Sequence, residues 1–239
     1  MTLRRERLRK LITAAFIFAV LFLIVAVLIE TGHIAWFDDA VISAVQGLEN
    51  DGLTRVMKWF TFLGSSLMAV ILSVLAFFFL MVVLKHRREL LMFLTAVGGS
   101  ELWNLLLKYA IQRDRPNTHR LIEITGYSFP SGHSMGAFSL YGAFAFLVWR
   151  HIPFLAGRIA MIAAGVALTL LIGISRIYLG VHYPSDVLGG YLASAAWLMV
   201  SILLFEKILE AFRKLAWKAG PRVIWKHREL CKPNMERKL

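Results

Sequence analysis

The sequence holds a single cysteine, Cys231, among 239 residues. One thiol excludes an intrachain disulfide and a cysteine-based metal site. Charged residues are scarce as well, at 18% against about a quarter in soluble domains, whereas hydrophobic residues make up 58%. A soluble fold of this size could not bury so much apolar surface, so the composition predicts a membrane protein.

Acidic residues are the next shortage, because 15 Asp and Glu stand against 27 Lys and Arg, a formal net charge of +12. A basic balance of this size can indicate nucleic acid as a partner. Here the cations cluster beside apolar stretches and form no basic face with interleaved aromatic residues, so we expect no nucleic acid partner. Internal repeats, low-complexity segments and a second domain are also lacking, which predicts one integral-membrane domain over residues 1–239.

Long apolar stretches predict an all-α bundle of membrane-spanning helices. A span needs about 20 apolar residues to cross about 30 Å of hydrocarbon. The first two stretches contain no charge, and the last three are shorter or richer in small residues, as in helices packed inside a bundle. The six predicted spans are 11–29, 62–84, 90–107, 134–149, 159–174 and 187–205.

The distribution of Lys and Arg predicts the orientation of this bundle. The N-terminus, the turn at Lys85, the turn from Arg150 to Arg158 and the basic tail 206–239 all fall on one side, which should be cytoplasmic. Both termini are then cytoplasmic. The first span is interpreted as an anchor, because its apolar run exceeds that of a signal peptide and no A-x-A-like cleavage site follows it.

Residues 30–61 and the tail have patterns typical of the membrane surface. Apolar residues recur at helical spacing from Trp36 to Leu48 and again from Leu53 to Phe60, which predicts amphipathic helices lying in the interface. These helices either only cover the bundle or guide lipid to a site. The basic, Trp-containing tail is expected to lie on the anionic headgroups of membrane phospholipids.

Lys108 ends the third predicted span, with Asn104 and Ser100 before it at steps of four residues. This stripe must face the bundle interior, because polar groups in hydrocarbon are costly. Alone, Lys108 could simply extend its ammonium group to the interface. The Arg115-Pro116 pair follows, and its proline predicts a turn that directs Arg115 back toward the end of the span.

Glu101 interrupts the same span near its centre. A carboxyl group there is expected to point inward, near the face that carries Asn104 and Lys108. Our hypothesis is a buried group that supports the site, and the rival interpretation is a proton relay.

The segment Pro130-Ser131-Gly132-His133 immediately precedes the fourth predicted span. Ser131 can cap that helix, and the backbone amide of Gly132 would then point out of its N-terminus, where anions bind. A cap without any ligand is a common alternative for Ser-Gly. It does not explain His133 in the first turn, where the helix dipole disfavours an imidazolium unless an anion is nearby.

Arg176 follows the fifth predicted span, and His182 and Asp186 lie on the short connection to the sixth. Pro184 between them predicts the start of the last helix, with Asp186 in its first turn. A His and an Asp four residues apart around such a turn can hydrogen-bond, which fixes the imidazole tautomer and frees the other ring nitrogen for attack. All these cations and histidines fall on the same predicted membrane face.

Together the three segments read K-x6-R-P over 108–116, P-S-G-H over 130–133 and S-R-x5-H-x3-D over 175–186. This pattern resembles the signature of the type 2 phosphatidic acid phosphatase superfamily of integral-membrane lipid phosphatases. Every signature position is filled, in order, and the six-span layout agrees. One departure is Asp114, where relatives often carry an apolar or proline residue, and which could partly neutralise Arg113 or Arg115.

The resemblance implies a role for each motif residue. His182 would be the nucleophile, Asp186 would hold and polarise it, and His133 would protonate the leaving oxygen and then activate water. Asn104 and Glu101 are not motif positions, and their expected role in supporting the site from behind rests on their place in the third span alone. The groups that would bind the phosphoryl oxygens, in place of metal ions, are Lys108, Arg115, Ser131, Gly132 and Arg176.

The leading interpretation is therefore a hydrolase for a lipid phosphate or diphosphate, without cofactor or metal, at the extracytoplasmic face of a cell membrane. Candidate substrates are undecaprenyl diphosphate, phosphatidylglycerol phosphate, phosphatidic acid and lysophosphatidic acid. The alternative is a non-hydrolytic lipid-phosphate binding or transport protein on the same bundle, although the ionisable residues crowd one face and line no path across the midplane. The remaining histidines are scattered, and we interpret each as interfacial or superficial: His33, His86, His119, His151 and His227.

Overall fold

The computed structural model describes residues 2–85 and 89–218, and this part of the chain contains helices and connections but no strand. Eight α-helices occur in it, with a five-residue π-helical segment after α4 and a short 3₁₀ turn after α6. Their bounds are α1 Thr2–Glu30, α2 Ala35–Gln46, α3 Asp51–Leu63, α4 Ser66–Phe78, η1 Phe79–Val83, α5 Glu89–Ile111, α6 Gly132–Val148, η2 Trp149–His151, α7 Leu155–Tyr178 and α8 Pro184–Lys218. The all-α prediction is confirmed.

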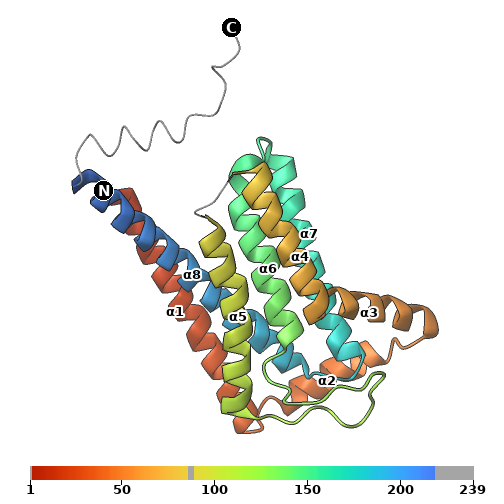
Figure 1. The fold of residues 1–239 in the computed structure, drawn as a ribbon. Helices are drawn as coiled ribbons and strands as arrows, with labels where there is room; N and C mark the ends of the chain where they lie inside the picture. Colours follow the sequence, from red (N-terminus) through yellow and green to blue (C-terminus); the bar gives the residue numbers. More distant parts are fainter. Residues whose placement is uncertain (1, 86–88, 219–239) are drawn as a thin grey trace.

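Five stretches in the described residues are long and apolar enough to cross a membrane: Arg5–Glu30, Ser66–Val83, Glu89–Ile111, Leu155–Tyr178 and Pro184–Ala211. They correspond to five of the predicted spans. The sixth prediction, 134–149, coincides with α6, which has only 17 residues and packs in the middle of the bundle (Figure 1). The exposed large hydrophobic side chains follow these helices, as a multi-pass membrane protein requires.

The second predicted span begins four residues too early. Gly64 closes α3 as its C-cap residue, and the hydroxyl of Ser65 caps α4 by accepting a hydrogen bond from the amide of Met68. The apolar run is continuous through this point, but the backbone is not. Residues 62 and 63 therefore belong to α3, which lies across the bundle axis in Figure 1.

The last helix is longer than predicted and absorbs part of the tail. It starts at Pro184, with Asp186 in its first turn as expected, and continues to Lys218. The tail predicted over 206–239 is therefore helical up to residue 218, and its remainder, with Cys231, lies outside the described residues. The same holds for residues 86–88 of the basic turn after Lys85.

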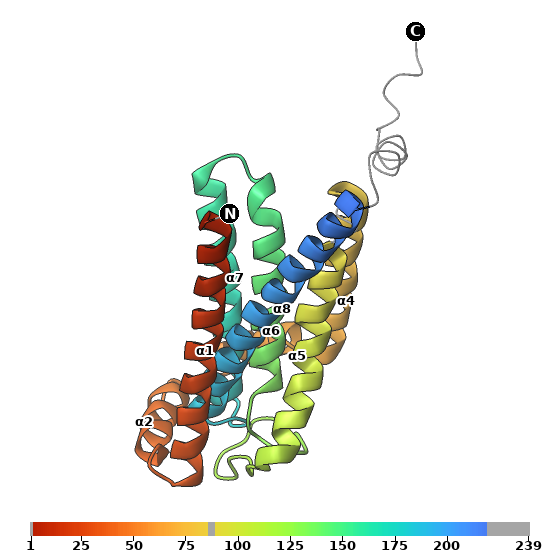
Figure 2. The same ribbon diagram turned by 90° about the vertical axis from the view of Figure 1, so that its left-hand side faces the viewer.

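The helices are arranged so that α1 runs beside α8 and the start of α1 lies at the same end of the bundle as the end of α8 (Figures 1 and 2). One apolar core joins α5, α6 and α8 around Phe93, Leu140 and Ile202. A second, with the rings of Phe22 and Phe129 stacked 5.5 Å apart, fastens α1 to the segment that precedes α6. These cores hold the helix ends that carry the motifs in fixed positions.

Candidate active site

All three sequence motifs meet at one end of the bundle. There α5 and α7 end, α6 and α8 begin, and the segment 112–131 crosses beneath them (Figure 1). Gln112 directly follows α5 with a φ of 52°, so the chain reverses sharply and carries Arg113 and Arg115 back under the bundle. The predicted turn that directs Arg115 back toward the end of the third span is confirmed, and it begins at Gln112.

His182 and Asp186 form the pair that their spacing predicts. The imidazole Nδ1 lies 3.3 Å from Asp186 Oδ2, and both side chains are buried. The other ring nitrogen, Nε2, lies 3.1 Å from Arg115 Nη1. A carboxylate only accepts hydrogen bonds and a guanidinium only donates them, so the two neighbours favour the same tautomer, with the proton on Nδ1 and a lone pair on Nε2.

The electrostatic setting keeps this imidazole neutral. Burial lowers the pKa of His182 to about 3, although the Asp186 carboxylate acts in the opposite direction, and the charges of Arg176 and Arg115 contribute to the lowering. The ring is therefore unprotonated at neutral pH, as a nucleophile must be.

Asp186 is held by four partners. Its Oδ2 accepts hydrogen bonds from the Ser128 hydroxyl and from the Tyr183 amide at 2.8 Å, in addition to the His182 contact. Its Oδ1 accepts a hydrogen bond from Arg113 Nη1 at 2.7 Å. The carboxylate is thus fixed in orientation, and through it the imidazole plane is fixed as well.

A second carboxylate lies behind Asp186, on one of the helices predicted to lie in the membrane interface. Asp38 of α2 is 1% exposed, and its Oδ2 pairs with Arg113 Nη2 at 2.8 Å. It also accepts hydrogen bonds from the amide and hydroxyl of Ser185, at 2.8 and 2.6 Å. Arg113 therefore bridges two carboxylates, and α2 is fastened to the first turn of α8. No sequence signal links Asp38 to residues so distant in the chain.

Three cations surround the imidazole. Arg115 donates to the carbonyls of Val181 and Gly126, each at 2.8 Å, and Lys108 Nζ donates to the Tyr127 carbonyl at 2.5 Å. Arg176 is 2% exposed, donates from Nη1 to the Thr61 hydroxyl, and has a buried Nε with no hydrogen-bond partner among the described residues.

Within the described part of the chain, none of these three cations forms a salt bridge with a carboxylate. Asp114 is exposed and pairs with neither neighbouring arginine there. Buried cations without counter-ions are costly, and an anionic ligand between them removes that cost.

His133 lies at the first turn of α6, close to the cations Arg176 and Arg115. Its ring packs against Gly64, because a Cβ at residue 64 would lie only 3.1 Å from its Cδ2. The break between α3 and α4 thus makes room for the second histidine. Thr61 and Gly64 are both site residues that the sequence analysis missed.

The turn before α6 is formed as predicted and is braced from α5. The Ser131 hydroxyl caps the helix by accepting from the Ser134 amide, and the Ser131 amide donates to the Asp186 carbonyl at 3.0 Å. Asn104 donates to the Pro130 carbonyl at 3.1 Å, and its Oδ1 would lie 3.0 Å from a Cβ at residue 132. Gly132 is therefore needed for this close approach, and the polar stripe of Ser100 and Asn104 faces the interior as expected.

Glu101 differs from its neighbours on the stripe. The residue as a whole is exposed on α5, although its Oε1 approaches Gly136 of α6, where a Cβ would lie 2.8 Å away. The expectation of a buried, inward-pointing side chain is therefore wrong in part, since only the carboxyl tip reaches the neighbouring helix. The described residues offer it no cation as partner.

We expect Glu101→Gln to keep turnover within about twofold of the native protein, because the group contacts none of the residues around His182 and a surface-type change costs little. The pH dependence of the rate should also stay in place. A displaced pH–rate profile in a variant that still folds, checked by size-exclusion chromatography in detergent, would instead support the proton-relay interpretation.

A known protein family matches the part of the chain that carries the motifs. The sequence model of the PAP2 superfamily matches residues 89–210, about half of the chain, and this range includes every motif residue from Lys108 to Asp186. The chain belongs to the PAP2 superfamily. Asp38 and Thr61 lie outside the matched residues. The contacts of Asp38 with Arg113 and of Thr61 with Arg176 therefore come from the structure alone.

Two curated PAP2-type relatives are informative. Phosphatidylglycerophosphatase B of Bacillus subtilis is 36% identical over 199 residues, which cover 81% of this chain and 95% of that protein. A protein of Escherichia coli K12, provisionally named an undecaprenyl-diphosphatase, is 38% identical over 87 residues, which cover 33% of this chain and 39% of that protein. Both names describe lipid phosphatases.

A solved PAP2 structure agrees with the fold. The crystal structure of a transmembrane PAP2-type phosphatidylglycerolphosphate phosphatase from Bacillus subtilis matches with a TM-score of 0.72 and 33% identity, over 82% of this chain and 97% of that one. The all-helical membrane bundle is therefore the PAP2 arrangement, with the candidate site at one end of it.

Proposed function

We propose that this PAP2 lipid phosphatase removes a phosphate from a lipid phosphomonoester or diphosphate through a phosphohistidine on His182. The observation that carries the proposal is a set of three buried or half-buried cations that form no salt bridge with any carboxylate in residues 2–85 and 89–218. They lie around an imidazole whose unprotonated nitrogen faces Arg115. Such a site stabilises a phosphoryl group, whose charge moves onto its three outer oxygens as it is transferred.

In the first step, the lone pair of His182 Nε2 attacks phosphorus and the bond to the leaving oxygen breaks. Throughout this step, the Asp186 carboxylate accepts a hydrogen bond from His182 Nδ1–H and stabilises the positive charge that the ring acquires. The arriving anion offsets the neighbouring cations, so His133 can carry a proton and give it to the leaving oxygen. In the second step, His133 takes a proton from water, the new P–O bond forms, and the N–P bond breaks.

The phosphoryl oxygens would be held by Lys108, Arg115 and Arg176. Arg176 Nε is the donor without a described partner, and the amide of Gly132 at the α6 N-terminus adds another. Because Ser131 already binds Ser134, its main contribution is to shape this turn. In our proposal these protein cations supply the charge stabilisation that divalent metals supply in other phosphatases.

Phosphate release from a panel of purified lipids tests the substrate and the metal requirement together. We expect phosphatidylglycerol phosphate to be hydrolysed, since the Bacillus subtilis relative that covers most of the chain is named for it. We expect EDTA to change the rate by less than about twofold, because fixed side chains supply the positive charge around the phosphate. Undecaprenyl diphosphate and phosphatidic acid complete the panel. Activity that disappears with EDTA and returns only with added Mg²⁺ would contradict metal independence, and no release from any of the three lipids would contradict hydrolysis.

We further propose six membrane spans, with α6 as the short fourth one, α2 and α3 in the interface, and the site outside the cytoplasm. This orientation follows the Lys and Arg distribution, which favours the cytoplasm for the end that holds the start of α1 and of α7. The exposed position of α3 across the bundle axis supports an interfacial location.

Thiol labelling in intact cells checks this orientation. In a Cys231→Ser background, Asn117→Cys should react with a membrane-impermeant maleimide, because residue 117 is exposed beneath the site. Leu155→Cys, 66% exposed at the opposite end, should react only after permeabilisation. Labelling of Leu155→Cys alone in intact cells would reverse the topology.

A further inference from the structure

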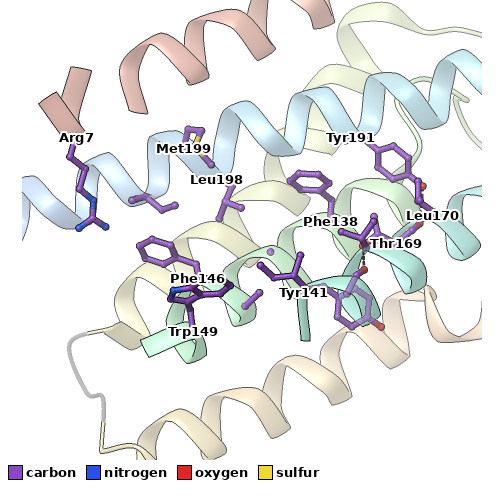
Figure 3. A pocket seen from close by; sticks show the side chains of 16 residues that line it. Arg7, Phe138, Tyr141, Phe146, Trp149, Thr169, Leu170, Tyr191, Leu198 and Met199 are labelled. Atoms are coloured by element: carbon purple, nitrogen blue, oxygen red, sulfur yellow. Dashed lines mark hydrogen bonds between the residues drawn. The ribbon is translucent and has the colours of Figure 1, made fainter. Parts of the chain in front are cut away.

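A large apolar cavity lies between α6, α7 and α8, and its lining includes none of the three cations around His182. Its volume is ≈ 830 Å³, within the range of about 300–1,000 Å³ typical of ligand sites. Figure 3 shows Phe138, Tyr141 and Leu198 lining its middle, with Arg7 and Trp149 at one end and Tyr191 and Thr169 at the other. Val166 in this lining is 51% exposed, so the space opens toward the bilayer and a lipid chain can enter it from there.

The chemistry of the lining favours a hydrocarbon chain. Most side chains around the cavity are apolar, and at its inner end the hydroxyls of Tyr191 and Thr169 both donate to backbone carbonyls at 2.8 Å. Water is stable in a cavity only when several polar groups face it, so this one should exclude water. The surrounding helices belong to a multi-pass membrane protein, where lipid chains are the available apolar solvent.

The outer end of the cavity is basic and aromatic. Arg7 lies there and pairs with Glu206 at 3.3 Å, while the guanidinium of Arg158 lies over the Trp149 ring at 5.3 Å. The charge of Arg158 therefore adds to that of Arg7 at this end of the cavity. Arginine and tryptophan at the end of a membrane helix are typical of the headgroup level, and positive charge there attracts anionic lipids.

This end of the cavity is far from His133 and His182. Trp149 follows the last residue of α6 and His133 lies in its first turn, which places them about 24 Å apart at 1.5 Å per residue. A lipid whose headgroup meets Arg7 therefore belongs to the leaflet opposite the site, and its phosphate cannot also reach His182.

We propose that this cavity binds one chain of an anionic phospholipid from the leaflet opposite the active site, with the headgroup phosphate at Arg7. The bound lipid fills the space between α6, α7 and α8 and is a permanent part of the bundle, distinct from the substrate.

Native mass spectrometry of the full chain in a mild detergent tests this site with two probes of equal acyl chains, phosphatidylglycerol and phosphatidylcholine. Phosphatidylglycerol carries only a phosphodiester, so the assay does not depend on the proposed hydrolysis. We expect one retained lipid and a preference of about fivefold for the anionic probe, the ratio expected for one arginine near the headgroup.

Three variants locate the binding. Gly165→Leu fills the cavity, because a Cβ there only touches Tyr141 Cβ at 3.5 Å and the remaining atoms enter the space, so retention should fall about fivefold or more. Gly98→Leu is the matched control, since nothing lies within 4 Å of its Cβ and it does not line the cavity. Arg7→Gln should abolish the preference between the probes but leave a lipid bound.

Equal retention in Gly165→Leu and Gly98→Leu would overturn the proposal, as would a preference that survives Arg7→Gln. A native protein that carries no lipid, or a lipid-free dimer that seats a second copy in the cavity, would overturn it too. Should Gly165→Leu not fold, Val166→Phe fills the same cavity from an exposed position on α7 and carries the same expectation.

Discussion

Replacing His182 with alanine should lower phosphate release by more than about 10⁵-fold on every lipid substrate, the scale on which losing a catalytic nucleophile acts. The variant removes Nε2, the atom that faces Arg115 at 3.1 Å. It leaves the three cations around the imidazole in place. Initial rates with purified protein measure the effect. His119→Ala is the matched control, because that imidazole is exposed and pairs with Glu49 at 2.6 Å, outside the site. Wild-type rates in His182→Ala, with contaminating phosphatase excluded, would contradict the assignment.

His133→Ala should have a graded effect that depends on the leaving group. A monoester such as phosphatidic acid expels an alkoxide that needs a proton, so its hydrolysis should slow by about 10²–10⁴-fold, the usual contribution of a general acid. Undecaprenyl diphosphate expels a phosphate that is already a stable anion, so it should lose less. Equal fractional losses, measured where chemistry limits the rate, would leave His133 with phosphate binding only.

A further effect concerns Asp38, whose hydrogen-bond partners are Arg113 and Ser185 and not the three cations expected to bind phosphate. We expect Asp38→Asn to lower kcat by about 10–100-fold with little change in KM, because an outer partner that orients a reacting group acts on this scale. The substitution removes the negative charge that pairs with Arg113, so the Arg113 side chain is held less firmly against Asp186. Asp186 then orients the His182 imidazole less well. Asp39→Asn is the matched control, since the next residue carries the same charge but is exposed. An unchanged kcat in Asp38→Asn would remove Asp38 as a positioning residue.

The double variant Asp38→Asn with Arg113→Gln distinguishes a positioning role of Asp38 from a role in stability alone. Removing one partner of a buried ion pair costs about 3–5 kcal/mol, and removing the second charge as well recovers part of that loss. Thermal unfolding in detergent should therefore show the double variant more stable than Asp38→Asn. Its kcat should stay low because Asp186 has lost Arg113. Recovery of both stability and kcat would mean that Asp38 only holds the fold together.

The features that the sequence predicted correctly are local ones. Ser131 caps α6 and Pro184 opens α8 because these preferences depend on a few neighbouring residues. His182 meets Asp186 because four residues around a helix start bring them together. The inward stripe of Ser100 and Asn104 follows from helical spacing in an apolar medium.

The features that it missed depend on contacts across the chain. Asp38 pairs with Arg113, 75 residues away, and bonds to Ser185, 147 residues away, so neither partner is visible in a local pattern. Arg113 entered the sequence analysis only as a charge that Asp114 could partly neutralise. The break at Gly64 was hidden because hydrophobicity measures residence in the bilayer and not helix continuity. Gly64 could have been suspected from the Gly-Ser-Ser run, since glycine often ends a helix and serine begins one.

The central claim is a covalent phosphate on His182, and trapping it is the most direct measurement. His133→Ala slows the attack of water, so this variant, mixed rapidly with a diphosphate lipid labelled in its terminal phosphate, should accumulate the intermediate. Quenching in alkaline denaturant preserves a phosphohistidine, and peptide mapping locates it. We predict label on the peptide that contains His182, and none when His182 is also replaced by alanine. Label on another residue, or continued turnover with no labelled protein at any time, would contradict the account.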